Sequence, residues 1–237
     1  MASTELVTAV EAALEQEPAV NLHRFPIEVT WNDTLRALRL EGTAEDIAAL
    51  RRIRQIAAAH VGAEHLHDDL HVPATGGRTD DELCEAVVRT LSGEPAFRVV
   101  SVGDAQQGAP PGPGDDQAWI AVSVSGSRVH LEGRLPSTSH RRLAEVLTWW
   151  VAGTTRVEND IEAHYEDDSD EELTDAVRMV LDKDPSLDAG RVRARALNHT
   201  VVLEGAVRSD ANRSRATLDC WYIPGVEDVD NRLQVLE

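Results

Sequence analysis

The letters Leu-Glu-Gly occur three times in this chain, and the residues that follow them keep the same spacing each time. The three glycines are Gly42, Gly133 and Gly205, and a second glycine follows each of them after 20 positions, at Gly62, Gly153 and Gly225. Eight residues further on stands Leu70, Ile161 or Leu233. A spacing shared by three stretches indicates an internal repeat, so the chain is predicted to contain three copies of one structural module.

Each copy also carries the same pattern of secondary-structure signals. It opens with apolar residues at positions i, i+3, i+4 and i+8 followed by a proline, which places an apolar stripe on one face of a helix and ends that helix. Two alternating stretches then predict a β-hairpin, and a helix N-cap candidate follows at Asp46, Ser137 or Ser209. A last alternating stretch closes each copy, so the expected order is α-β-β-α-β.

The predicted fold class is α+β, with three tandem modules that each contain a three-stranded sheet and two helices on one face. Polar residues alternate along the strands, which is typical of a sheet that is covered on one side only. The expected boundaries are residues 1–72, 80–166 and 167–237, called the first, second and third segments below. Residues 103–117, rich in Gly and Pro, are expected to be a flexible insertion in the second segment. The linkers are short, so contacts between neighbouring modules are expected.

The repeated glycines Gly42, Gly133 and Gly205 are interpreted as mainly structural. Each has the inward orientation of the leucine two positions before it. A side chain there is expected to collide with the helix that crosses the sheet, or the backbone leaves the strand with positive φ.

The charge balance restricts the partners of this chain. It has 42 acidic and 23 basic residues, a net charge of −19, which disfavours nucleic-acid binding and works against docking on anionic lipid. No apolar run reaches the length of a transmembrane segment, and no secretion signal is evident. Cys84 and Cys220 are too few for a disulfide framework, so a cytoplasmic location is expected.

Three histidines form the one candidate metal site in the sequence. His65, His67 and His71 share one strand face with Asp69, and His-x-His on a strand suits zinc or nickel. The alternative is a solvated polar face, which is favoured because neither sister copy keeps the set. We therefore expect these histidines to be accessible to solvent and to bind no metal tightly.

Two aromatic pairs occupy the same positions of the second predicted helix in the second and third copies. They are Trp149-Trp150 and Trp221-Tyr222. Adjacent helical residues point about 100° apart, so both members of a pair cannot face their own core. A contact between modules is favoured over a lipid-interface anchor because the linkers are short.

Signals of catalysis are sparse. The acidic pairs Asp115-Asp116 and Asp167-Asp168 lie in predicted linkers, and the sequence has no phosphate-cradling glycine loop, nucleophile elbow or paired cysteine motif. Neither an enzyme activity nor a cofactor is expected.

The sequence resembles the BON (bacterial OsmY and nodulation) domain family. The resemblance rests on the α-β-β-α-β order, the inward glycine, Gly-Val-Glu-Asp-Val-Asp-Asn-Arg-Leu at 225–233 and Val-Glu-Asn-Asp-Ile at 157–161. It covers nearly the whole chain in three copies, of which the first departs most, with Asp68 where the family favours Asn. The family supplies no catalytic motif, only the glycines.

The resemblance implies a non-enzymatic triple-BON binding or scaffold protein, associated with phospholipid or the bacterial envelope in osmotic stress, or bound to another protein. One cytoplasmic relative binds potassium. The alternative function is therefore a cytoplasmic sensor of a small ligand or a monovalent ion such as potassium, held by carboxylates and carbonyl oxygens.

Overall fold

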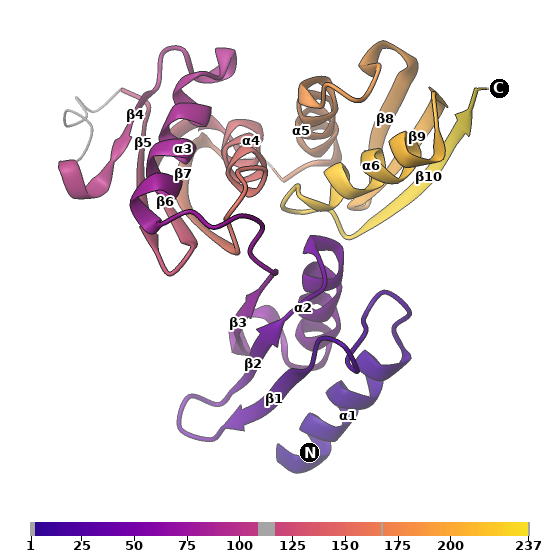
Figure 1. The fold of residues 1–237 in the computed structure, drawn as a ribbon. Coiled ribbons are helices and arrows are strands. Elements are labelled where there is room, and N and C mark those ends of the chain that lie inside the picture. The colour runs from indigo at the N-terminus through magenta and orange to yellow at the C-terminus, as the bar shows by residue number, and fades with distance from the viewer. Residues whose placement is uncertain (1–2, 109–116, 167, 237) are drawn as a thin grey trace. The chain divides into compact units, whose positions relative to one another are not determined.

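The computed structural model describes residues 3–108, 117–166 and 168–236. Within these residues the chain forms six α-helices and three small sheets, a mixed α+β fold (Figure 1). It divides into two compact units, Met1–Pro73 and Ala74–Glu237. The first unit holds the first segment, and the second unit holds both the second and the third.

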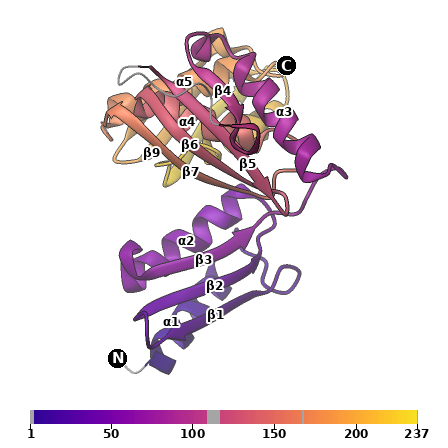
Figure 2. The ribbon, with the colours of Figure 1, turned by 90° about the vertical axis from the view of Figure 1, so that its left-hand side faces the viewer.

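The first unit has one sheet and two helices. Its elements are α1 (Ser3–Gln16), β1 (Ile27–Asn32), β2 (Ala37–Thr43), α2 (Ile47–Val61) and β3 (Leu66–His71). The strand order is β1-β2-β3, with β1 antiparallel and β3 parallel to β2, as Figure 2 shows. The apolar side chains of α1 and α2 form the core with those of the strands; Leu14, Leu40 and Leu70 are completely buried.

The second segment has four strands, whereas the sequence predicted three. Its elements are α3 (Asp80–Ser92), β4 (Ser101–Asp104), β5 (Trp119–Ser125), β6 (Arg128–Ser137), α4 (Thr138–Trp149) and β7 (Arg156–Tyr165). The strand order is β4-β5-β6-β7, and β4 runs parallel to β5. The prediction of a three-stranded sheet is therefore wrong for this segment.

The additional strand extends into the stretch predicted as a flexible insertion. Residues 103 and 104 of that stretch belong to β4, and Ala105–Gln107 form a single 3-10 turn. Residues 109–116 lie outside the part of the chain that the structure describes. A strand of four residues that contains Gly and Asp has no alternating apolar signal; it forms because the edge of β5 offers backbone hydrogen-bond partners.

The third segment returns to three strands. Its elements are α5 (Asp170–Lys183), β8 (Val192–Leu197), β9 (Thr200–Val207), α6 (Asp210–Trp221) and β10 (Asp228–Val235). The strand order is β10-β9-β8, with β8 antiparallel and β10 parallel to β9. Asn198 and His199 both have positive φ, as a two-residue hairpin turn requires.

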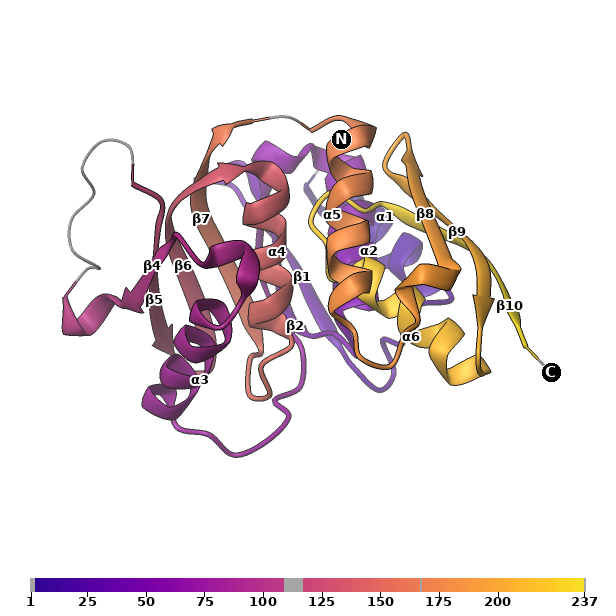
Figure 3. The ribbon, with the colours of Figure 1, turned by 90° about the horizontal axis from the view of Figure 1, so that it is seen from above.

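The second and third segments pack together through their helices. Helix α4 contacts α5, and Figure 3 shows the two side by side between the two sheets. The helices of each segment contact only one face of their own sheet, so the opposite faces are directed away from this junction.

An aspartate at the start of a helix holds the hairpin turn in each of these two segments. The carboxylates of Asp80 on α3 and Asp170 on α5 each accept hydrogen bonds from two successive turn amides, those of Gly126 and Ser127 or of Asn198 and His199. These backbone donors lower the pKa of both carboxyl groups. No local sequence pattern marks this repeated link.

The repeated glycines lie where a side chain would strike backbone. A Cβ atom on Gly133 would lie 2.1 Å from the carbonyl oxygen of Trp119, and one on Gly205 would lie 2.0 Å from that of Arg191. Gly42 has the same relation to Pro26, at 2.6 Å. The expected collision with the crossing helix is thus wrong, because the obstacle is the carbonyl of the residue that precedes the glycine's partner on the neighbouring strand. The alternative expectation, a positive φ, holds for Gly42 (148°) and Gly205 (122°) but not for Gly133.

Candidate functional site

The three candidate metal-binding histidines follow the edge of the first unit's sheet. His65 and His67 are exposed, and the Nε2 of His71 lies 2.9 Å from the hydroxyl of Thr43. His65 lies in the 3-10 turn before β3, so of the three only His67 and His71 alternate along the strand, and two histidines alone do not complete a metal site. Among the described residues, no group of three or more His, Cys, Asp or Glu side chains could hold a metal ion.

The two aromatic pairs meet at the junction of the second and third segments. The rings of Trp149 and Tyr222 lie 6.3 Å apart between centroids, although they come from different segments. The guanidinium of Arg215 on α6 lies 5.6 Å from the ring centroid of Trp150. Trp149 and Trp221 are buried. One member of the second segment's pair therefore contacts a ring, and the other contacts a cation, of the third segment.

A buried arginine adds polar contacts to this junction. Arg142 on α4 is 3% exposed, and its Nε donates to the carbonyl oxygen of Pro224 at 2.9 Å. The same guanidinium pairs with Asp168 at the start of the third segment. The backbone amide of Ser139 donates to the carboxylate of Glu172 at 2.7 Å. These contacts hold the first turn and middle of α4 against the third segment.

A second ion pair crosses the junction at its other end. Lys183, the last residue of α5, lies 2.8 Å from the carboxylate of Glu94, which is 8% exposed. A buried carboxylate needs a partner, so the pairing orients the end of α5 toward the second segment.

Two carboxyl groups share one arginine beside the junction. The Nε of Arg215 lies 2.7 Å from Asp184 and 3.1 Å from Asp219, and Asp219 is completely buried. Burial raises the pKa of Asp219 to about 8, and the neighbouring Asp184 carboxylate adds to the rise. Burial also acts to raise the pKa of Asp184, but hydrogen bonds from Asp219, Ser186 and Arg215 outweigh it and hold that pKa well below its usual value.

The pair therefore binds one proton at neutral pH. Asp219 carries the proton and donates a hydrogen bond to the carboxylate of Asp184. Arg215 balances the single negative charge of Asp184. Paired carboxyls with separated pKa values can serve as acid and base. Asp184 caps the end of α5, and Arg215 and Asp219 lie on α6, so the arrangement stabilises the contact between these two helices.

A serine and a histidine in contact have a structural explanation. The hydroxyl of Ser137 lies 2.9 Å from the Nδ1 of His140, a spacing that a nucleophile and its base could share. Ser137 is the N-cap of α4, and Ser209 makes the equivalent contact with Asn212 at the start of α6. The repetition with a residue that is no base indicates helix capping.

The two thiols are not activated. Burial raises the pKa of Cys84 to about 11, and it also raises the pKa of Cys220, which is completely buried. Both therefore remain protonated at neutral pH, and a protonated thiol is a poor nucleophile.

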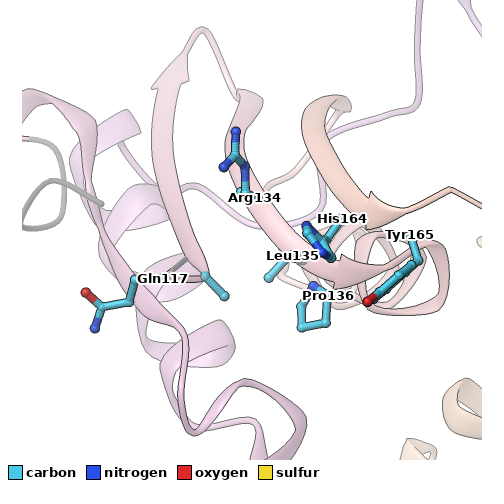
Figure 4. Close-up of a pocket in the computed structure, with 7 residues that line it drawn as sticks. Gln117, Arg134, Leu135, Pro136, His164 and Tyr165 are labelled. Carbon is cyan, nitrogen blue, oxygen red and sulfur yellow. The ribbon is translucent and has the colours of Figure 1, made fainter. Parts of the chain in front are cut away.

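A hollow of about 200 Å³ lies where β5 begins and β6 and β7 end (Figure 4). Its wall includes the apolar residues Leu135 and Pro136 and the edge-to-face rings of His164 and Tyr165, 4.6 Å apart. Arg134 in the wall is within 3.5 Å of Glu162. Three larger hollows of about 400, 460 and 620 Å³ lie along the third segment, beside α5 and β8 and over the open face of that sheet.

No described helix combines the length and apolarity that crossing a bilayer requires. Comparison with curated proteins found no match. Among solved structures, the C-terminal domain of CdsD, a structural protein of the Type III secretion system of Chlamydia trachomatis, aligns with 100% of both chains at 16% identity and a TM-score of 0.26. A second CdsD structure aligns over 98% of this chain and 92% of that chain, at 17% identity and a TM-score of 0.25. Scores this low carry no property of those proteins to this chain.

The family comparison agrees with the architecture of the second and third segments. The sequence model of the BON domain matches residues 111–164 and residues 169–237, together just over half of the chain. These ranges contain the hairpin, the second helix and all but the final residue of the last strand of the second segment, and nearly all of the third. The protein belongs to the BON domain family.

Proposed function

We propose that this protein is a non-enzymatic binding and scaffold protein whose open sheet faces receive its partners. The observation that carries the proposal is the layering of the second unit. Its helices pack between two sheets, which leaves two outward faces on one compact unit (Figure 3). Buried contacts such as those of Arg142 hold the layers together, and this suits a scaffold with two binding surfaces.

We also infer that residues 1–72 form a third BON module. The first segment has the same element order and the same mixed sheet. Gly42 lies opposite Ile27 as Gly133 lies opposite Ile120 and Gly205 opposite Val192. The shared close approach of these glycines to a backbone carbonyl supports the same inference.

On the basis of the family, we also propose that the protein is cytoplasmic and associates with phospholipid or the envelope in osmotic stress. The net charge of −19 favours protein or zwitterionic lipid surfaces over anionic bilayers. The aromatic pairs belong to the contact between segments, because their rings meet groups of the neighbouring segment.

Photocrosslinking in cells tests the scaffold function. A crosslinking amino acid placed at Glu132 or at Gln234, exposed on the two open faces, is expected to give adducts with protein or lipid. The same group at Glu85, exposed on helix α3, serves as the control. Adducts confined to Glu85, or none from either face, would contradict the proposal.

The potassium-sensor alternative predicts a different result. Replacing sodium with potassium at constant ionic strength would then raise the melting temperature of the purified chain by several degrees, because a ligand that binds only the folded state stabilises it. The scaffold function predicts no difference between the two cations.

A further inference from the structure

The outer edge of strand β8 has no neighbouring strand in the described structure, whereas the equivalent edge in the second segment does. The third sheet has the order β10-β9-β8, so β8 is an edge. Its Val192 lies opposite Gly205, as Ile120 on β5 lies opposite Gly133. At β5 the corresponding edge is covered by β4, whose Val102 lies opposite Ile120. The fold therefore shows one such edge accepting a further parallel strand.

The outer edge of β8 has backbone amide and carbonyl groups that could form hydrogen bonds with a further strand. The amide of Ala196 points away from β9, because it donates to the hydroxyl of Thr174 on α5 at 2.8 Å. Residues two apart on a strand direct their backbone groups to the same side. The amide and carbonyl of Ala194 therefore also point outward, while the backbone groups of Arg193 and Arg195 face β9.

The side chains along this edge are basic. Arg193 and Arg195 are exposed, and although their backbones pair with β9, neither guanidinium forms a hydrogen bond or ion pair with a residue that the structure describes. Glu204, opposite Arg193 in the register, lies 3.7 Å from Arg232. A hollow of about 460 Å³ runs beside the strand, with Arg178 of α5 in its wall.

The first and second segments lack this pair of arginines. The chain has a net charge of −19, and the positions of Arg193 and Arg195 correspond to Glu28 and Thr30 on β1 of the first unit. Unpaired arginines repel a basic strand and attract an acidic one, so they make an open edge selective for acidic partners.

We propose that β8 binds an extended acidic segment of a partner protein as a fourth strand, in the position that β4 takes against β5. This deepens the scaffold function proposed above and rests on it. Acidic residues at every second position of the partner face Arg193 and Arg195, and the residues between them face the helical side. Backbone hydrogen bonds to Ala194 supply affinity, and the arginines supply specificity.

The full chain and the peptide acetyl-Thr-Val-Glu-Val-Glu-Val-Thr-amide test the proposal by calorimetry. We expect binding that the double variant R193E/R195E weakens by about tenfold or more. The control R89E/R98E changes two exposed arginines of the second segment and alters the net charge equally. It is expected to leave the affinity within about twofold, since both residues belong to the second segment and not to β8. Amide exchange at Ala194 should slow when the peptide binds.

Peptides separate strand pairing from charge attraction without altering the protein. N-methylation of alternate peptide bonds removes the backbone donors and keeps both glutamates, so it should abolish binding. Equal binding of the methylated peptide, an equal loss in R89E/R98E, or arginine-dependent binding of phosphatidylglycerol vesicles without peptide binding would each overturn the proposal. Adducts from Glu132 and Gln234 in the R193E/R195E variant would show that the scaffold function stands independently.

Discussion

At the scale of single residues, the repeated glycine is the most constrained position of each sheet. In Gly205→Ala the new methyl would lie 2.0 Å from the carbonyl oxygen of Arg191, so either β8 or β9 must shift. We expect the free energy of unfolding to fall by on the order of 3 kcal/mol, measured by urea denaturation. Gly77→Ala is the matched control, because no atom lies within 4 Å of its Cβ position. Equal stability of the two variants would refute this account.

The buried proton on Asp219 makes stability depend on pH. The pKa of Asp219 is raised from 3.8 to about 8, so between these values the folded chain holds a proton that the unfolded chain has released. The free energy of unfolding therefore decreases as pH rises through this window. Asp219→Asn keeps a neutral hydrogen-bond donor toward Asp184 and lacks the titration.

The test compares urea denaturation of the two proteins at about pH 5 and about pH 9. The stability of Asp219→Asn relative to the natural chain should rise between these values by on the order of 3 kcal/mol. Both measurements lie above the range in which Asp184 titrates, so its lowered pKa does not confound them. A difference that stays constant with pH would contradict a buried, protonated Asp219.

The sequence predicts the positions of the glycines but not the buried carboxyl pair. A spacing repeated three times marks the glycines, whereas nothing local distinguishes Asp219 among 42 acidic residues. Its one cue in the sequence is Arg215, a possible ion-pair partner four positions earlier on the same helix. Asp219 itself lies between helix positions that are predicted to face the core. The sequence also could not predict that a backbone carbonyl obstructs a side chain at each glycine, because this depends on the register with the preceding strand.

At the scale of elements, the periodicity of apolar residues in the sequence predicts the order of helices and strands, but it does not predict β4. The helices carry long apolar stripes and clear caps, which local chemistry determines. Strand β4 has four residues, and its stability comes from the neighbouring edge of β5. A strand that depends on its neighbour leaves little trace in its own sequence.

Amide exchange tests β4 directly. The amide of Ser101 donates to Ala118, so the amide of Gly103, two residues on, also faces β5 while that of Val102 faces outward. We expect the amide of Gly103 to exchange more slowly than that of Val102 in two-dimensional NMR. Equally fast exchange at both positions would show that β4 is not formed in solution.

At the scale of the whole molecule, the second and third segments form one unit through contacts that no local pattern marks. The sequence predicted that neighbouring modules touch, because the linkers are short. It did not identify Arg142, whose Nε bonds a carbonyl 82 residues further along the chain. An arginine on a helix usually indicates a solvated position, and only the packing of α4 against the third segment buries this one.

Replacing this arginine should uncouple the two segments. Arg142→Ala removes the donor to Pro224 and the partner of Asp168, and it leaves a gap where the guanidinium packed. We expect a loss of about 3 kcal/mol in the free energy of unfolding and two separate transitions in place of one. Fluorescence of Trp149 and Trp150 at the junction should then change at lower denaturant concentration than the far-ultraviolet circular dichroism. Arg141→Ala is the control, because Arg141 makes one surface pair, 3.6 Å from Glu166, worth at most about 1 kcal/mol. If the two signals of Arg142→Ala change together, or if Arg141→Ala splits them equally, the junction does not depend on the buried guanidinium.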